Sequence, residues 1–325
     1  MATINRRAFN IGLSAAAAST VAAPAIAQTY PSQDVHLVCA FPPGSGADVI
    51  VRWYAEKLRP IMGATVIVEN KVGAMAFLAT EYTARAKPDG HTIFLHGWSA
   101  IASANHLFKN QAIDATKALT LAGTTNRQPH MVLVDTKSPI KSLGELTALL
   151  KRKKDKASFG STNVLTTIIG SIYKEKEKLE AVEVVYRTAN DSINDLASGQ
   201  LDYGVLDNIF AASQDRAGRV RVLGISTAQR MKATPQYPTM TEQGVPMDVV
   251  GGFGMMVPSA TPRPIIEVIN DKFNQVTRTE EATKFFNSIA SDPWVTTVAE
   301  AEAFLQDEIK KWADWVRIAN IKPQG

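Results

Sequence analysis

The residues best suited to binding chemistry form a glycine-rich loop between a predicted buried strand and a predicted amphipathic helix. The loop reads Phe41-Pro42-Pro43-Gly44-Ser45-Gly46-Ala47-Asp48. The first N–H groups of a helix have no acceptor within the helix and carry partial positive charge, so such a junction binds anions. The rest of the sequence favours a small carboxylate over a nucleotide as that anion.

Asp48 stands in the first turn of the predicted helix, where its carboxylate has two interpretations. It can complement the helix dipole and cap free N–H groups. It can also accept a hydrogen bond from a bound water or a ligand amide, although its charge would repel a carboxylate ligand.

Small or hydroxylated residues also follow other predicted strands, which is where ligands bind in open α/β sheets. These groups are Gly97-Trp98-Ser99-Ala100, Ser161-Thr162-Asn163 with Thr166 and Thr167, Arg187-Thr188-Ala189-Asn190, and Asp207-Asn208. Trp98 could form the wall of a site for an aromatic ligand, or it could belong to the core.

No single loop can hold a ligand with useful affinity. A helix terminus contributes about 0.3 to 1 kcal/mol, and up to about 2 kcal/mol when partly buried. Micromolar binding needs about 8 kcal/mol. Charge-assisted hydrogen bonds contribute about 1.5 to 3 kcal/mol each. We therefore expect three to five donors from two lobes to hold the ligand between them.

Two segments resemble enzyme motifs without completing them. The first loop has two glycines of a dinucleotide fingerprint but Val49 in place of the third. Gly97-Trp98-Ser99-Ala100-Ile101 resembles a nucleophile elbow, with Ile101 where the final glycine is required. We therefore expect no catalytic residue, and a secreted hydrolase is the least favoured function.

Cysteine and histidine usage argues against a metal cofactor. Cys39 is the single cysteine, so the chain can form no intrachain disulfide. The five histidines include no i, i+4 pair and have no neighbouring carboxylate cluster, so we expect neither zinc nor non-haem iron. No other cofactor is expected.

The start of the chain predicts export. Arg6-Arg7 precede an alanine-rich apolar run from Ile11 to Ala23, and Ala25-Ile26-Ala27 forms a cleavage site. Both the twin-arginine and the general secretory route fit this segment. Removing residues 1–27 leaves 33 basic and 31 acidic residues, a net charge of +2, because the segment holds two arginines and no acid. This balance predicts a soluble periplasmic protein that binds no nucleic acid.

Predicted strands and helices alternate along the mature chain, which is typical of the α/β class. About 300 mature residues exceed the usual size of a single core, so we expect two domains. Residues 28–128 with 250–325 would form lobe 1, and residues 129–249 lobe 2. The chain would cross between the lobes twice, near residues 127–130 and 249–252, and such a hinge favours closure around a ligand.

Several motifs together resemble the Bug family, the TctC-like periplasmic solute-binding proteins of tripartite tricarboxylate transporters. They occur in order across nearly the whole mature chain. The motifs are Tyr30-Pro31-Ser32, Phe41 to Asp48 with Arg52, Val68-Glu69-Asn70, Pro88-Asp89-Gly90, Phe159-Gly160-Ser161, Gly199-Gln200-Leu201-Asp202, Ile225-Ser226-Thr227, Pro238-Thr239, Glu242-Gln243-Gly244, Val257-Pro258 and Thr261-Pro262.

This resemblance implies a two-lobed periplasmic-binding-protein fold, the Venus flytrap, with a mostly parallel sheet flanked by helices in each lobe. It also implies that backbone amides, hydroxyls and ordered waters hold a carboxylate between the lobes. The ligand-binding candidates, from the resemblance and from the residues themselves, are Phe41, Gly44, Ser45, Gly46, Ala47, Asp48, Trp98, Ser99, Ser161, Thr162, Asn163, Thr166, Arg187, Thr188, Ala189 and Asp207.

The chain departs from the family pattern in its loops. Ser45 replaces the usual second loop glycine, residues 162–167 replace a glycine-rich stretch with a histidine, and Arg187-Thr188-Ala189 replaces Lys-Gly-Gly. Arg187 is either a new anion partner or a surface residue. These changes leave the identity of the carboxylate open.

The sequence thus predicts an exported monomer that delivers a small organic carboxylate to membrane transporter subunits resembling TctA and TctB. The alternative is a sensory protein that presents its ligand to a membrane receptor.

Overall fold

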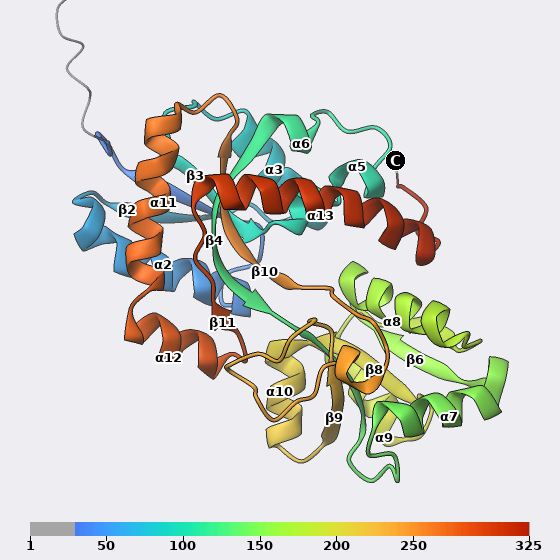
Figure 1. Cartoon of the computed structure of the whole chain (residues 1–325). Helices are drawn as coiled ribbons and strands as arrows, with labels where there is room; N and C mark the ends of the chain where they lie inside the picture. The colour runs from blue at the N-terminus through green and yellow to red at the C-terminus, as the bar shows by residue number, and fades with distance from the viewer. Residues whose placement is uncertain (1–29, 325) are drawn as a thin grey trace, which may run out of the picture.

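The computed structural model describes residues 30–324, which form two lobes, drawn one above the other in Figure 1. The predicted signal peptide lies outside the described residues. In spatial order, the first sheet contains β11 (Asp292–Pro293), β4 (Leu119–Gln128), β10 (Gly251–Pro258), β3 (Thr92–Gly97), β1 (Val35–Cys39) and β2 (Val66–Asn70). The second contains β7 (Val182–Val185), β6 (Ser158–Ser161), β8 (Tyr203–Asp207), β5 (His130–Asp135) and β9 (Val220–Ile225). The predicted α/β class and two-lobed fold are confirmed.

Both sheets are mixed rather than mostly parallel, which corrects the expectation from the sequence. Strand β1 pairs in parallel with β2 and β3, and β6 with β7 and β8. Strands β4, β10 and β11 in one sheet, and β5 and β9 in the other, form antiparallel pairs. The reason is the crossing itself, because the chain leaves the first lobe along β4 and returns beside it along β10, with Gly251 opposite Gln128.

Alternating residues of the central strands supply two separate apolar clusters in the first lobe, as the period of a strand requires. Leu37 and Leu95 face α2 (Gly46–Met62), α11 (Arg263–Thr277) and α12 (Glu280–Ser288). Val38 and Phe94 belong to the opposite cluster, which includes residues of α3 (Phe77–Ala84), α4 (Ser99–Ala102), α5 (Ala104–Leu107) and α13 (Val298–Ile318). A further short helix, α6 (Ala115–Ala118), precedes β4.

The C-terminal helices pack on the first lobe, as predicted. Helix α11 contacts α2 and β4, and α13 contacts β4 and α4. Helix α13 also contacts α8 (Val164–Glu177) of the second lobe, and Figure 1 shows it lying across the first lobe with its C-terminal end above α8.

The second lobe has helices α7 (Leu143–Lys153), α8, α9 (Ala189–Ala197) and α10 (Asn208–Arg216) around its sheet. The sequence predicted α7, α8 and α9, but it did not predict α10, whose nine residues show only weak apolar periodicity. Helix α10 starts directly at the end of β8, so its first turn lies at the same edge of the sheet as the predicted binding residues.

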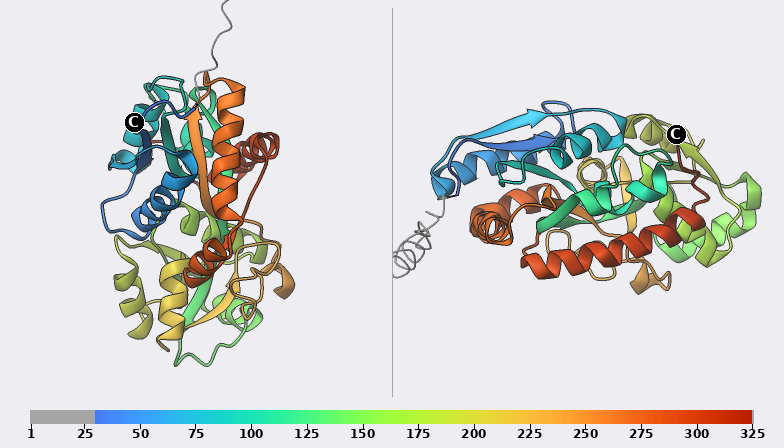
Figure 2. Two further views of the ribbon diagram at one scale, coloured as in Figure 1. Left: turned by 90° about the vertical axis from the view of Figure 1, so that its left-hand side faces the viewer. Right: turned by 90° about the horizontal axis from the view of Figure 1, so that it is seen from above.

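Hydrogen bonds also join the lobes beside the two chain crossings. The side chain of Asn208 donates to the backbone oxygens of Ile289 and Ala290, at 2.7 and 3.1 Å. The carboxylate of Asp292 accepts from the N–H groups of Lys232 and Ala233. The segment before β11 therefore fastens the first lobe to the second, and the left view of Figure 2 shows the two lobes one above the other.

Candidate functional site

The loop from Phe41 to Asp48 is held by the carboxylate of Asp48, whose side chain is 1% exposed. Asp48 accepts hydrogen bonds from the Gly44 N–H at 2.8 Å, from Arg52 Nε at 2.7 Å and from Asn70 Nδ2 at 2.8 Å. Asn70 Nδ2 also donates to the Phe41 carbonyl at 2.8 Å. The structure thus favours the capping interpretation, since Asp48 fixes the loop through the end of the neighbouring strand β2.

These contacts also keep Asp48 ionised. Burial raises the pKa of its carboxyl group, but the hydrogen bonds from Arg52, Asn70 and the Gly44 backbone together outweigh burial and lower the pKa below its usual value. The negative charge of Asp48 is therefore neutralised locally by Arg52, half of whose side chain is exposed.

Four predicted binding residues are the N-caps of four helices. Ser45 caps α2, Asn163 caps α8, Thr188 caps α9 and Asp207 caps α10, each accepting from an N–H in the first turn. These helices follow β1, β6, β7 and β8, so their N-termini lie at the carboxyl ends of parallel strands. Because each side chain serves its own helix, the groups left for an anion are mainly backbone N–H groups with partial positive charge.

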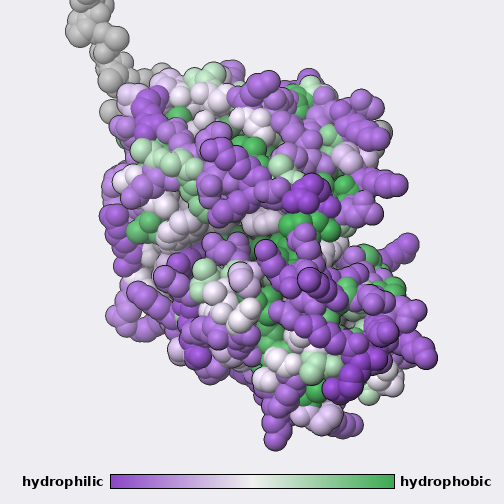
Figure 3. Space-filling model, turned by 45° about the vertical axis from the view of Figure 1, so that its right-hand side comes forward, coloured by the Kyte–Doolittle hydropathy of each residue, from purple (hydrophilic) through white to green (hydrophobic). Residues whose placement is uncertain are grey.

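The two lobes touch at these loops. A Cβ atom built on Gly46 would lie 3.5 Å from Cδ1 of Ile209, in the first turn of α10. The structure therefore brings the first-lobe loop beside the end of β8, where Asp207 lies. Figure 3 shows a mainly hydrophilic face, with hydrophobic residues visible at the waist between the lobes.

The second-lobe hydroxyls are occupied by local bonds. Thr166 is buried, and its Oγ1 accepts from the N–H groups of Thr162 and Asn163 within a capping box. Ser161, also buried, donates to Oε1 of Glu183 at 2.6 Å. Arg187 and Thr188 are exposed, and Ala189 is half-buried.

Trp98 is part of the core, which favours the second of its two interpretations over a role as the wall of a ligand site. Its side chain is 1% exposed and makes edge contacts with Trp294 and Phe304, at 5.6 and 5.0 Å between ring centroids. These partners lie about 200 residues away in the chain, so sequence spacing could not reveal them. Ser99 stays half-buried at the start of the four-residue helix α4.

Phe41 is the aromatic residue that the structure exposes at this edge, with 39% of its surface accessible. Its ring packs at 4.9 Å from that of His96, which stacks in turn on Phe94. Burial lowers the pKa of His96 to about 4, so its imidazole is neutral at physiological pH. The sequence analysis did not select His96, Glu183 or Ile209, and no short motif marks them.

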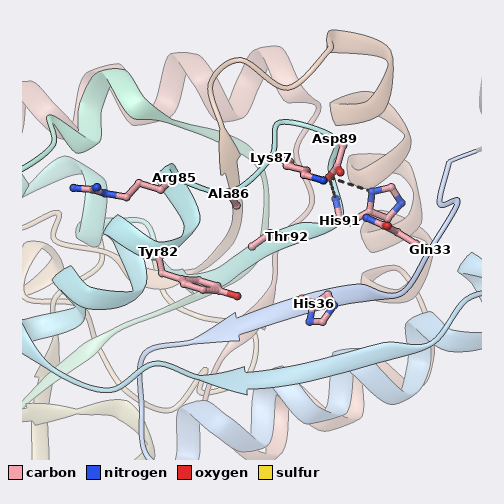
Figure 4. A pocket seen from close by; sticks show the side chains of 9 residues that line it. All are labelled: Gln33, His36, Tyr82, Arg85, Ala86, Lys87, Asp89, His91 and Thr92. Atoms are coloured by element: carbon pink, nitrogen blue, oxygen red, sulfur yellow. Dashed lines mark hydrogen bonds and ion pairs between the residues drawn. The ribbon is translucent and has the colours of Figure 1, made fainter.

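A pocket of about 450 Å³ lies away from these loops, at the amino ends of β1 and β3. Figure 4 shows its side chains, with Arg85 pointing away from the others. His36 contacts Glu69 at 2.6 Å, Arg85 contacts Glu81, and His91 lies 3.1 Å from Asp89. Because these side chains already contact carboxylates, we assign no ligand to this pocket.

Within residues 30–324, no helix has the length and apolar character needed to cross a bilayer. The same residues contain no cluster of three or more His, Cys, Asp or Glu side chains that could hold a metal ion.

Two solved structures share this fold. A Rhodopseudomonas palustris protein solved with adipate has a TM-score of 0.78 and 22% identity, covering 91% of this chain and 100% of that one. MatC from the same species, solved with bound malate, has a TM-score of 0.72 and 23% identity, covering 88% and 100%. At these identities, the likeness establishes the fold alone.

Sequence comparison identifies the family. Protein BugT of Bordetella pertussis is 27% identical over 311 residues, which cover 94% of this chain and 95% of BugT. The model of the tripartite tricarboxylate transporter family receptor, TctC, matches residues 50–321. The chain therefore belongs to the TctC receptor family, as its resemblance to the Bug proteins indicated.

Proposed function

We propose that this protein captures a small organic carboxylate between its two lobes and delivers it to a membrane transporter. The observation that supports this most is the set of four helix N-termini at the carboxyl ends of β1, β6, β7 and β8. Helix N-termini favour anions, and the contact between Gly46 and Ile209 brings two of these ends together across the lobes.

The binding surface would consist of backbone N–H groups with a few side chains at its edge. Gly46 and Ala47 stand in the first turn of α2, where their N–H groups have no acceptor within the helix. Phe41 would contact the apolar part of the ligand. Asp48 and Thr166 would position their loops, while Trp98 would support the site from the core.

We further propose that residues 1–27 are removed during export and that the mature protein works as a periplasmic monomer without enzyme activity. Residues 28–128 and 250–325 would then move as one lobe against residues 129–249. The partners of the protein would be transporter subunits resembling TctA and TctB. Adipate and malate, found in the two structural relatives, are the first ligands to try.

A thermal-shift screen of the purified mature protein tests this function. A ligand at 100 times its dissociation constant raises the free energy of unfolding by about 2.7 kcal/mol, which gives a measurable shift. We expect shifts with carboxylates and none with sugars or cationic amino acids. Shifts with sugars or cationic amino acids and none with carboxylates would refute the proposal, and turnover of a carboxylate ester would refute the absence of enzyme activity.

A further inference from the structure

The C-terminal ends of α7 and α8 lie side by side at the edge of the second lobe where β6 and β7 begin. Lys151, in the last turn of α7, contacts Glu177, the last residue of α8, at 3.0 Å between Nζ and Oε2. The Val182 N–H donates to the Ala157 carbonyl at 2.8 Å, so the strands next to these two helix ends also start together. Figure 1 shows both helices on the right-hand side of this lobe. The two helix ends therefore form one surface.

This surface concentrates positive charge. We call residues 151–156 and 174–180 the basic end, and they contain eight Lys or Arg and four Asp or Glu, a net charge of +4. Asp202, which pairs with Lys153 at 2.6 Å, lowers this charge to +3. Because the mature chain carries a net charge of +2, the rest of the chain is slightly negative. Long-range attraction to an anionic surface would therefore act at the basic end.

Most cations of the basic end have no carboxylate partner. Lys151 and Lys153 are the two that form ion pairs. Lys174 lies over the Phe159 ring, at 5.9 Å from its centroid. The remaining cations are exposed and form no ion pair with any residue in the range 30–324; they are Arg152, Lys154, Lys156, Lys176 and Lys178.

The helix dipole does not explain all of these lysines. Cations in the last turn of a helix are favourable, and both last turns already contain them. Lys154 and Lys178 are the C-caps of α7 and α8, with φ at +51° and +53°. Positive φ is strained for lysine, and glycine is the usual residue where a helix ends in this way. Both helices thus keep a positive charge at a position where glycine would stabilise the fold.

The residue types indicate what kind of anionic partner fits the basic end. Seven of its eight cations are lysines. Interfaces between proteins are enriched in arginine and aromatic residues and depleted in lysine. Lysine is a mobile point charge, which suits a surface whose anions have no fixed arrangement. Anionic phospholipids form such a surface, and clusters of about four to eight Lys or Arg are typical of proteins that bind it.

We propose that the basic end docks the protein onto the anionic phospholipid surface of a membrane. The contact is peripheral and electrostatic. Strand β6 begins at the basic end and finishes at Ser161, directly before a candidate binding loop, so docking leaves that loop at the opposite end of the strand from the lipid. This inference goes beyond the proposed function and does not depend on which ligand the protein binds.

Co-sedimentation of the wild-type mature protein with vesicles tests the proposal. Vesicles of equal parts phosphatidylglycerol and phosphatidylcholine are compared with vesicles of phosphatidylcholine alone. At about 0.1 M salt, the protein should bind the anionic vesicles about ten-fold or more tightly. At about 1 M salt this preference should disappear, because the Debye length falls from about 10 Å to about 3 Å. No preference at low salt, or a preference that survives high salt, would overturn the inference.

Two variants with the same net charge test whether the position of the lysines matters. The basic-end variant combines Lys154→Gln, Lys156→Gln and Lys176→Gln. The control variant changes three exposed lysines of the first lobe, Lys87→Gln, Lys109→Gln and Lys322→Gln. The basic-end variant should bind anionic vesicles about ten-fold or more weakly than wild type, and the control should lose less than about two-fold. Equal losses would show that overall charge, rather than the basic end, attracts the vesicles.

A second variant separates docking from stability. Lys154→Gly combined with Lys178→Gly removes two charges and the backbone strain together. The urea midpoint should rise, while the affinity for anionic vesicles should fall about five-fold or more. A purely structural role of the two lysines would not produce these opposite shifts. A lower midpoint, or vesicle binding equal to that of wild type, would contradict the inference.

The vesicle experiments and the carboxylate screen fail independently. A protein that ignores anionic vesicles can still capture a carboxylate, so that result would refute the docking surface alone. A protein that binds the vesicles but no carboxylate would refute the proposed function and leave the docking surface in place.

Discussion

Gly46 of the first lobe lies directly against Ile209 of the second, leaving room for no more than a methyl group between them. A Cβ atom on Gly46 would stand 3.5 Å from Ile209 Cδ1, which is ordinary van der Waals contact. The loop that presents free N–H groups is therefore also the surface on which the lobes meet. Any larger side chain at this position would hold the lobes apart.

Replacing Gly46 with leucine should therefore weaken ligand binding by about ten-fold or more. Gly46 does not adopt a positive φ, so the substitution adds bulk without backbone strain. Calorimetry with the best ligand of the carboxylate screen measures the effect, and small-angle scattering should show a more open molecule. Gly46→Ala is the matched control and should bind nearly as wild type. Equal affinity for the leucine variant and wild type would show that the lobes do not close at this contact.

Asp48→Asn should lower the free energy of unfolding by about 2 kcal/mol, since hydrogen bonds to a charged group contribute about 1.5 to 3 kcal/mol. The amide would face the donors of Arg52, Asn70 and Gly44 with fewer acceptor sites. Urea unfolding at pH 7 measures this, with Asp34→Asn on the exposed surface as the control. Because the pKa of Asp48 is lowered on folding, its contribution is present above pH ~4 and is lost as the pH falls further. An unchanged unfolding midpoint would show that the loop does not depend on this carboxylate.

The buried histidines should make the protein less stable in mild acid. Burial lowers the pKa of His96 and of His130 to about 4, from an ordinary value of 6.5. Because the pKa is lower in the folded protein, the unfolded chain binds the proton at a higher pH than the folded protein does. The free energy of unfolding is therefore highest above pH 6.5 and decreases as the pH falls towards 4. Between pH 7 and pH 5 the loss should be about 2 kcal/mol for each histidine.

His96→Phe isolates one of these two contributions. Phe41, Phe94 and Phe253 surround the His96 ring, so a phenyl group should fit. Urea unfolding at pH 7 and pH 5 should show a loss about 2 kcal/mol smaller than in wild type. The same loss in both proteins would mean that His96 does not take up a proton on unfolding.

Gly252 should tolerate no side chain, because it lies in the second crossing between the lobes. A Cβ atom there would stand 2.2 Å from the Asn126 carbonyl oxygen and 2.4 Å from the Trp98 ring, with φ at +154°. Gly252→Ala should lower the free energy of unfolding by about 3 kcal/mol or more. Gly144→Ala, where a Cβ atom meets nothing within 4 Å, should change it by less than about 1 kcal/mol. Similar effects of the two substitutions would argue against the close approach at the crossing.

The loops of the candidate site could be predicted because loop chemistry is local, whereas the capping roles of their side chains were seen only in the structure. Each candidate loop leads into a helix, and one side chain of the loop caps that helix. The four capping residues are Ser45, Asn163, Thr188 and Asp207. Their partners lie within three residues, so the residue types and their spacing carry the information. The sequence left two interpretations of Asp48 open, because one of its hydrogen-bond donors, Asn70, belongs to a different strand.

By itself, the sequence determined the family, the two-lobed α/β fold and the position of the strand-to-helix loops, since ordered motifs and strand-to-helix junctions are properties of the chain. The tertiary structure decided which side chains face which. It buried Trp98 against Trp294 and Phe304, placed Glu183 on the hydroxyl of Ser161, and set Gly46 against Ile209. These contacts join residues of different elements, and most of these residues are far apart in the chain. Tertiary packing determines such contacts, and no local pattern of residues encodes that packing.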